Sequence, residues 1–201
     1  LISSQVLCKS TIERNNYIEL GSIDKKTKVL GNLKYADFDD KRLKFCIGDV
    51  RDFNSIDDAA KNVDYIFHAA ALKQVPSCEF FPIEAIETNS LGANNVMKAA
   101  YENNVSKCIL LSTDKAVYPI NTMGLTKAIA EKLILNETYR KKTLISVVRY
   151  GNVLNSRGSV VPNFLNQLKE DNKIYITDKR MTRFTMTLNE SVAVSLKIYP
   201  F

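Results

Sequence analysis

The sequence predicts an α/β fold in which helices cover both faces of a mainly parallel sheet. Short apolar runs without strict alternation, at 43–50, 63–71 and 107–112, are typical of strands buried on both faces. Between and after them lie stretches with apolar residues at helical spacing, at 83–104 and 123–141. Several of the apolar runs end in small or polar residues, which is where open α/β sheets bind their ligands.

The expected elements follow one another in a regular order. The segment YIEL (17–20) is expected to form a short strand, and LKFCIGDV (43–50) a buried strand that ends in an acidic turn. The segment SIDDAAKN (55–62) predicts a helix capped by Ser55, because Asp58 stands three residues later. The alternation continues with a strand at 63–71, a helix at 83–104, a strand at 107–112, a helix at 123–141 and a strand at 144–153.

Composition and charge restrict the class of protein. Hydrophobic residues make up 45% of the 201 residues and charged residues 25%, which favours a folded domain, or one domain with the start of a second. The net charge of +6 suits an anionic small molecule. The basic residues are scattered in pairs and trios, which favours a solvated surface, so no nucleic-acid partner is expected.

Cysteine and hydropathy patterns indicate the compartment. Cys8, Cys46, Cys78 and Cys108 lie far apart and the chain has one histidine, so no metal site is expected. No apolar run reaches the roughly 18 residues of a membrane span, and no secretory signal is visible. These patterns predict a cytoplasmic protein with reduced thiols and no membrane span. The sequence begins with Leu1 instead of Met, which is consistent with a fragment.

The strongest chemical signal is STDK, which follows the buried strand at 107–112. It brings the hydroxyls of Ser112 and Thr113 next to the acid Asp114 and the amine Lys115. An adjacent acid and amine can move two protons on one substrate, although a surface ion pair is the ordinary alternative.

Small and polar residues after two other strands suggest a nucleotide site. Asp49 can accept a hydrogen bond from an adenine amino group with Val50 against the ring, or it can be an ordinary turn residue. Ala69–Ala71 allow close approach of a cofactor, and plain packing explains them equally well. His68 is interpreted as a core residue. Asn89 fits a helix poorly, so it either positions polar groups inside the protein or lies on the surface.

The segment after the last strand contains groups suited to a polar ligand. Gly151 and Gly158 allow tight turns, and Asn152 and Arg157 can bind polar groups. Arg183 is a candidate phosphate partner because its guanidinium is a planar fork. Each of these signals is weak alone.

Six motifs together are far more specific. GDVRD, HAAALKQVPSCE, STDKAVYPIN, RYGNV, SRGSV and MTRF occur in an order and spacing that resemble the extended short-chain dehydrogenases/reductases. Within that superfamily they resemble the CapD-like polysaccharide biosynthesis family, from about residue 22 to the end. The resemblance implies a Rossmann-like, doubly wound parallel sheet. It also implies a partial NADP-binding domain over 1–153 and a partial substrate-binding lobe over 154–201.

The nearest resemblance is to inverting UDP-N-acetylglucosamine 4,6-dehydratases, lyases with C5 epimerisation that serve capsule or O-antigen synthesis. It implies NADP as cofactor, a UDP-sugar as substrate and a homo-oligomer. Lys127 would hold the nicotinamide ribose, Lys115 would remove the C5 proton and Asp114 would protonate the departing 6-hydroxyl. Met123 stands where many relatives carry a catalytic tyrosine, and a thioether has no proton to exchange. Asp114 or Lys115 is expected to replace that phenol, with Tyr118 a weaker candidate.

The resemblance assigns the remaining site residues by position. The catalytic set is Thr113, Asp114, Lys115, Met123 and Lys127. The cofactor set is Asp49, Val50, Ala69, Ala70, Ala71, Asn89, Ser112, Lys127 and Tyr150. The substrate set is Lys73, Asn152, Ser159, Val160 and Arg183.

The N-terminal part departs from the family pattern. No glycine precedes Gly21, so the first strand and the glycine-rich turn that holds the cofactor pyrophosphate are expected to be missing. Residues 5–26 are expected to hold the first helix and the second strand. Ile23 stands where an arginine for the NADP 2′-phosphate is expected, and Lys25 or Lys26 is the candidate substitute.

Two other functions remain open. One is a UDP-sugar 4-epimerase on the same scaffold, whose reaction needs no C6 elimination and therefore leaves the acid–amine pair unexplained. The other is a truncated, non-catalytic module that binds a nucleotide sugar or assembles with partners.

Overall fold

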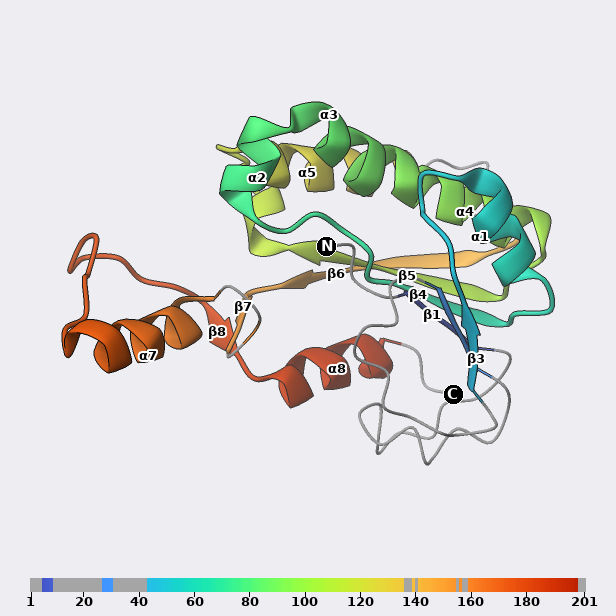
Figure 1. The fold of residues 1–201 in the computed structure, drawn as a ribbon. Coiled ribbons are helices and arrows are strands. Elements are labelled where there is room, and N and C mark those ends of the chain that lie inside the picture. The colour runs from blue at the N-terminus through green and yellow to red at the C-terminus, as the bar shows by residue number, and fades with distance from the viewer. Residues whose placement is uncertain are drawn as a thin grey trace.

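A six-stranded sheet forms the centre of the fold (Figure 1). The computed structural model describes residues 5–8, 27–30, 43–135, 139, 141–154, 156 and 159–198. The strands are β1 (Gln5–Cys8), β2 (Thr27–Leu30), β3 (Leu43–Cys46), β4 (Tyr65–His68), β5 (Lys107–Thr113) and β6 (Leu144–Tyr150). Their order is β3-β2-β1-β4-β5-β6, and every neighbouring pair without β1 is parallel. The predicted α/β class with a mainly parallel sheet is confirmed.

Strand β1 differs from the expectation for the N-terminal part. It lies between β2 and β4 and is antiparallel to both, with Val6 opposite Val29 on one side and Phe67 on the other. The prediction of a helix beginning at Gln5 is therefore wrong. An apolar segment in this place pairs the inner edges of β2 and β4, whose backbone groups would otherwise lack partners. The predicted strand 17–20 and Lys25 and Lys26 lie outside the described residues.

Helices cover both faces of the sheet. One face carries α1 (Phe53–Ala60), α2 (Val75–Phe80), α3 (Pro82–Ala85), the π-helix η2 (Ile86–Leu91), α4 (Gly92–Glu102) and α5 (Thr122–Ile134) (Figure 1). The main core joins α1, α4 and α5 to β4, β5 and β6 through side chains such as Met97, Leu110 and Ile134. Helix α8 (Leu188–Lys197) packs on the opposite face, where Leu196 contacts a smaller cluster with Phe67 and Val148.

Local chemistry moved several predicted boundaries. Helix α1 begins earlier than expected and is capped by Asp52, whose carboxylate accepts from the backbone amides of Asn54 and Ser55. The predicted Ser55 cap is wrong because an acidic cap three residues upstream was available. The predicted helix at 83–104 is divided by η2, in which Asn89 is buried. Helix α5 ends at Ile134, earlier than the predicted end at 141.

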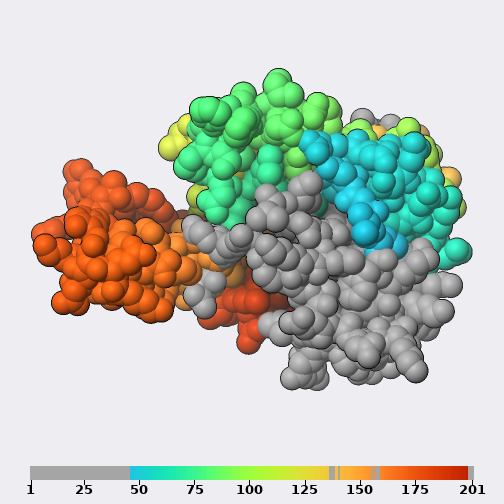
Figure 2. All heavy atoms as spheres, viewed as in Figure 1, coloured from blue at the N-terminus to red at the C-terminus, as the bar shows by residue number. Residues whose placement is uncertain are grey.

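A smaller lobe follows β6. Strand β7 (Asn152–Val153) pairs in parallel with β8 (Thr185–Met186), and helix α7 (Val160–Asp171) lies between them in sequence. Figure 2 shows α7 and the segment after it protruding beside the layered part, in orange. Helix α7 has no buried residue. Within the described ranges, no helix is long and apolar enough to cross a membrane, and no cluster of three His, Cys, Asp or Glu side chains could hold a metal.

Candidate functional site

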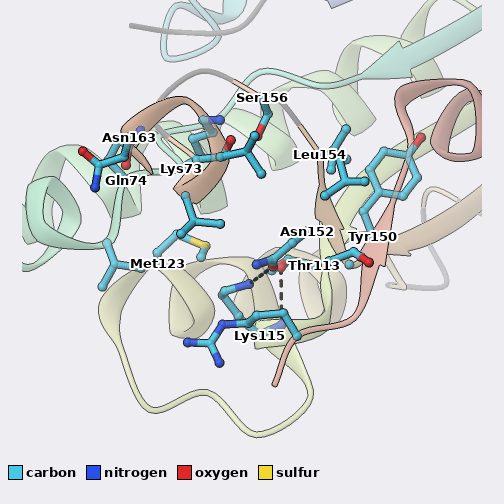
Figure 3. Close-up of a pocket in the computed structure, with 18 of the residues that line it drawn as sticks. Lys73, Gln74, Thr113, Lys115, Met123, Tyr150, Asn152, Leu154, Ser156 and Asn163 are labelled. Carbon is cyan, nitrogen blue, oxygen red and sulfur yellow. Dashed lines mark hydrogen bonds between the residues drawn. The ribbon is translucent and has the colours of Figure 1, made fainter. Parts of the chain in front are cut away.

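A cavity of about 1340 Å³ lies at the carboxyl ends of β4, β5 and β6, between α5 and the smaller lobe (Figure 3). This is the edge at which an open α/β sheet is expected to bind ligands. Thirteen predicted site residues line it: Ala69, Ala71, Lys73, Ser112, Thr113, Lys115, Met123, Lys127, Tyr150, Asn152, Ser159, Val160 and Arg183. Five others, Asp49, Val50, Ala70, Asn89 and Asp114, do not line it.

The acid and the amine of STDK have different positions. The short helix η3 (Asp114–Ala116) follows β5. Its N-cap is Thr113, whose hydroxyl oxygen accepts a hydrogen bond from the Lys115 backbone N–H at 3.3 Å. The Lys115 amine donates to Asp114 Oδ1 and to Asn152 Oδ1, each at 3.0 Å. Figure 3 shows Lys115 beside Thr113 and Asn152. Lys115 is thus the cavity-facing amine, and Asp114 is its partner.

Asp114 is held as a carboxylate. Burial raises the pKa of its carboxyl, but hydrogen bonds from the Lys115 amine and the Thr113 hydroxyl outweigh burial and bring the pKa below its ordinary value. An ionised Asp114 stabilises a positive charge on the Lys115 amine beside it.

The first turn of α5 sets the position of Lys115. Asn121 caps the helix, because its side-chain oxygen accepts a hydrogen bond from the Gly124 backbone N–H at 2.8 Å. A side chain at Gly124 would place its Cβ 2.5 Å from the Lys115 carbonyl oxygen. The absence of a side chain at Gly124 therefore lets η3 pack directly against α5. Met123, beside it, packs against Cys78 and Ala85 and turns toward the cavity.

Lys127 is a buried amine in the wall of the cavity. It lies one helical turn after Met123 and donates to the Leu111 carbonyl oxygen at 2.8 Å. Burial lowers its pKa to about 8, while the Glu131 carboxylate acts in the opposite direction. His68 is also fully buried, and burial followed by the charge of Lys127 lowers its pKa to about 3. His68 is therefore neutral near pH 7.

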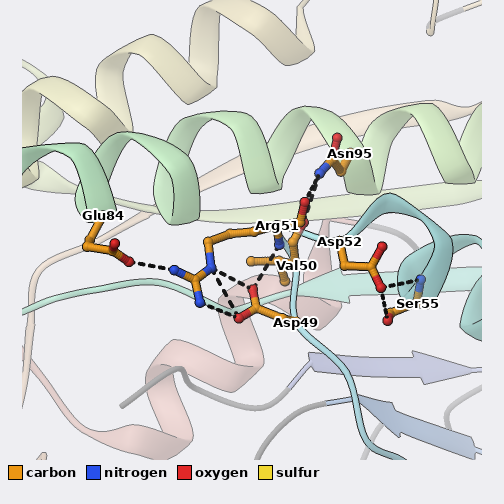
Figure 4. A network of polar contacts seen from close by, with 7 residues as sticks. All are labelled: Asp49, Val50, Arg51, Asp52, Ser55, Glu84 and Asn95. Carbon is orange, nitrogen blue, oxygen red and sulfur yellow. Dashed lines mark hydrogen bonds and ion pairs between the residues drawn. The ribbon is translucent and has the colours of Figure 1, made fainter.

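Asp49 is held in a polar network at the end of β3 (Figure 4). Its carboxylate accepts from the Arg51 backbone amide at 2.9 Å and from the guanidinium at 2.7–3.1 Å. These bonds to Arg51 lower the pKa of the Asp49 carboxyl. Arg51 also pairs with Glu84 at 2.5 Å. Val50 is buried, and a Cβ at Gly92 would lie 2.7 Å from its side chain.

Asn89 acts behind the cavity wall. Its amide exchanges two hydrogen bonds with the backbone of Leu72, at 2.8 and 3.0 Å, and donates to the Thr126 hydroxyl at 3.0 Å. It therefore ties the loop after β4 to α5, and the surface alternative is wrong. Ala70 is buried in the core, so among the three alanines only its neighbours Ala69 and Ala71 reach the cavity.

The smaller lobe supplies the opposite wall. The backbone N–H of Asn152 donates to the Phe184 carbonyl oxygen at 2.7 Å, and a Cβ at Gly151 would lie 2.7 Å from the same oxygen. This close approach brings Arg183, the residue before Phe184, to the cavity. The buried Ser159 hydroxyl finds no hydrogen-bond partner in the part of the chain that the structure describes. Arg157 and Gly158 lie outside that part.

Tyr118 does not replace the missing phenol. It lies after η3, is 88% exposed and is absent from the cavity wall. The expectation that Tyr118 is a candidate base is therefore wrong, because its side chain points into solvent.

Sequence reasoning missed several lining residues. Gln74 and Asn163 line the cavity, and Asn163 lies one helical turn after Ser159, a spacing that would have identified it. Tyr175 lies in an irregular segment, where no periodicity indicates which residues face a ligand. Glu131 and Arg149 form a 2.6 Å ion pair behind the wall, and neither carried a sequence signal.

Comparisons with known proteins point to nucleotide-sugar enzymes. The model of the family described as "Polysaccharide biosynthesis protein" matches residues 4–199. A protein of Rickettsia bellii named UDP-glucose 4-epimerase is 60% identical over 163 residues, which cover 80% of this chain and 47% of that protein. The chain thus spans about half the length of the curated relatives it matches.

Two solved structures resemble the fold closely. The X-ray structure of Pen from Bacillus thuringiensis is 43% identical, has a TM-score of 0.76 and covers 79% of this chain and 50% of Pen. MoeE5, solved in complex with UDP-glucose and NAD, is 25% identical with a TM-score of 0.65, over 75% of this chain and 56% of MoeE5.

These relatives correct one expectation. The assignment as a 4,6-dehydratase, a lyase acting on UDP-N-acetylglucosamine, is wrong, because the matched Rickettsia proteins are named as a 4-epimerase, which is an isomerase. The site geometry offers a physical reason. The Asp114 carboxylate is hydrogen-bonded to the Lys115 amine and does not line the cavity. The two side chains therefore do not face a substrate as separate acid and base.

Proposed function

The chain belongs to the polysaccharide biosynthesis protein family, and from this premise we propose that it takes part in inverting C4 of a UDP-hexose with a nicotinamide dinucleotide. The observation that carries the proposal is the Lys115 amine, which faces the cavity and is held between Asp114 and Asn152. The names of the Rickettsia relatives favour UDP-glucose as substrate. On this proposal, residues 1–153 serve mainly the cofactor and residues 154–201 mainly the sugar.

The residues at the inner end of the cavity fit a nicotinamide and its ribose. Ala69 and Ala71 leave space for a flat ring, and Lys127 and Ser112 offer polar groups beside it. A dinucleotide bound there supplies a hydride acceptor and donor for C4 of the sugar. The cofactor is proposed as a nicotinamide dinucleotide with or without the 2′-phosphate.

Lys115 is proposed as the acid–base group. In its neutral form the amine takes the proton of the 4-hydroxyl as the C4–H bond breaks and the hydride passes to the dinucleotide, and it returns that proton when the C4–H bond re-forms on the other face. Thr113 fixes the backbone of Lys115. Met123 supplies an apolar wall, because its thioether has no proton to give.

The outer wall fits a nucleotide diphosphate and a hexose. Lys73 and Arg183 are the proposed partners of the diphosphate, and Arg183 can bind two phosphate oxygens at once. The Ser159 hydroxyl, Asn152 and Val160 are proposed to contact the sugar. Inversion requires the 4-keto sugar to present both faces, and the cavity of about 1340 Å³ is proposed to hold the sugar nucleotide together with the dinucleotide.

The test is conversion of UDP-glucose to UDP-galactose by the purified protein, with Lys115→Ala as the variant. We expect the rate to fall about 10²–10⁴-fold, the usual contribution of a positioned acid–base group. Lys132→Ala removes an exposed amine from α5 and should keep the wild-type rate. If the wild-type protein gives no UDP-galactose, or if Lys115→Ala keeps its rate, the proposal fails.

A non-catalytic nucleotide-sugar binding module is the second candidate. Calorimetric binding of UDP-glucose without C4 inversion would support it. A homo-oligomer also remains proposed, because Phe80, Phe81 and Ile83 expose large apolar side chains on α2 and α3, and sedimentation can test it. The expected cytoplasmic location stays a prediction.

A further inference from the structure

A buried carboxylate beside the cavity joins α5 to two strands. Glu131 is 8% exposed and accepts from the Ser112 hydroxyl at 2.5 Å and from the Arg149 guanidinium at 3.0 and 2.6 Å. Ser112 and Arg149 are register partners in β5 and β6, so their side chains leave the sheet on the same face. Ser112, Glu131 and Arg149 thus form one cluster, called here the Glu131 cluster.

The Glu131 cluster reaches both the cavity and the solvent. Ser112 lines the cavity, and so does Lys127, which lies one helical turn before Glu131 on α5. At the other end the Arg149 side chain is 49% exposed. The mechanism above uses the amine of Lys115 and leaves this second set of charges without a role.

The charges around Lys127 explain what Glu131 does there. Burial lowers the pKa of Lys127 to about 8, and the Glu131 carboxylate limits that fall. His68 on β4 faces Lys127 but is neutral, and Arg149 on β6 is paired with Glu131. Burial raises the pKa of Glu131, but bonds from Arg149 and Ser112 outweigh it and keep the carboxyl ionised.

We propose that Glu131 is a positioning residue for the ligand site, which supplies a negative charge one helical turn from the Lys127 amine and makes Ser112 a hydrogen-bond acceptor, while Arg149 holds Glu131 in place. The Ser112 hydroxyl hydrogen is engaged by Glu131, so its oxygen can only accept. Among the described residues, one N–H of Lys127 is engaged, by the Leu111 carbonyl oxygen, which leaves two donors for a ligand.

The wall therefore presents a donor beside an acceptor, a pair suited to hydroxyl or amide groups of a ligand. The inference rests on the proposed function only in naming that ligand as a nicotinamide dinucleotide.

The direct test is the titration of Lys127 by NMR in protein labelled at the lysine ε-carbons, with the signal assigned from its loss in Lys127→Arg. Glu131→Gln keeps the size of the side chain and removes its charge. We expect the midpoint to fall by about 1 pH unit or more, as for loss of a nearby opposite charge. Glu131→Asp keeps the charge but shortens the side chain, so its Lys127 midpoint should lie between those of wild type and Glu131→Gln. Glu102→Gln, which removes an exposed carboxylate 3.9 Å from Lys98 on α4, should leave the midpoint unchanged.

The second readout is the affinity for NAD⁺ as a function of pH. Wild-type affinity should decline as the pH rises through about 8, and the decline should begin at lower pH in Glu131→Gln. An unchanged Lys127 midpoint in Glu131→Gln would overturn the inference. Should that variant be unfolded by circular dichroism, a wild-type affinity for NAD⁺ that does not decline as the pH rises through about 8 would overturn it instead. A shifted midpoint in a protein that binds no NAD⁺ would support the role of Glu131 and reject the proposed cofactor.

Discussion

The two walls of the cavity are built differently. Helix α5 buries seven of its residues, among them Met123, Lys127 and Glu131, between the sheet and the other helices. Helix α7 forms much of the opposite wall and buries none. It contributes Val160, Val161, Asn163 and Phe164 to the cavity from the protruding lobe.

This difference separates the chemistry from substrate binding. Lys127, proposed to act beside the cofactor, is buried and bonded to Leu111. Lys115, proposed to act on the proton, is partly buried and is held by Asp114 and Asn152. Apart from Lys73, the groups proposed to bind the sugar nucleotide lie on the smaller lobe, where a Cβ at Gly151 would lie 2.7 Å from the Phe184 carbonyl oxygen. A wall with little burial opens at low free-energy cost, which suits entry and turning of a large ligand.

Truncating a side chain in each wall should give the largest contrast. Ile134→Ala, at a fully buried position on α5, should lower the free energy of unfolding by about 2–5 kcal/mol because it leaves a cavity. Leu165→Ala on α7, where the side chain is 51% exposed, should change it by less than about 0.5 kcal/mol. Urea denaturation followed by circular dichroism measures both. Equal losses would show that the two walls share one core.

A buried amine in the α5 wall makes stability depend on pH. The Lys127 pKa falls from its ordinary 10.5 to about 8, so between these values the unfolded chain binds more protons and stability rises with pH. Lys127→Met should be more stable than wild type by up to about 3 kcal/mol at pH 7, with the gap closing toward pH 10.5. Chemical denaturation at pH 7 and 10 tests this. The exposed Lys132→Met is the control, and a gap independent of pH would contradict the prediction.

The junction between the walls should be sensitive to one methyl group. A Cβ in Gly151→Ala would meet the Phe184 carbonyl oxygen at 2.7 Å, so β8 must move or about 1–3 kcal/mol of strain results. Because Arg183 precedes Phe184, we expect weaker UDP-glucose binding by calorimetry with unchanged circular dichroism of the core. Asn166→Ala, on the exposed side of α7, should bind as wild type does. Equal affinity in Gly151→Ala would mean that the lobe is not positioned at this contact.

Helix caps should give the smallest effects. Asn121→Ala removes the bond to the Gly124 amide and should cost about 1 kcal/mol in thermal unfolding. Thr187→Ala removes the capping box of α8, which Thr187 forms with Glu190, and should cost a similar amount. Only Asn121→Ala should also slow catalysis, since its turn supports Lys115. If both variants keep the same catalytic rate, the cap at Asn121 does not support the catalytic position of Lys115.

Much of the layered part was predictable because its signals are local. The apolar run at 107–112 became β5, and the residues after it, Thr113 and Lys115, line the cavity as strand-end residues should. The antiparallel β1 was not predictable, since a four-residue apolar segment carries no mark of direction. The capping choice between Asp52 and Ser55 also depended on geometry that a motif does not contain.

Hydrophobic periodicity thus defined the alternation of strands and helices and placed the polar strand ends at one edge, because periodicity depends on residues close in sequence. Tertiary structure decided which of those polar groups meet. The hydrogen bond between Lys115 and Asn152 joins residues 37 apart in sequence. Ser112 and Arg149 come together through the register of β5 and β6, and both side chains bind the Glu131 carboxylate. Such encounters depend on how distant segments pack, and no local pattern in the chain records that packing.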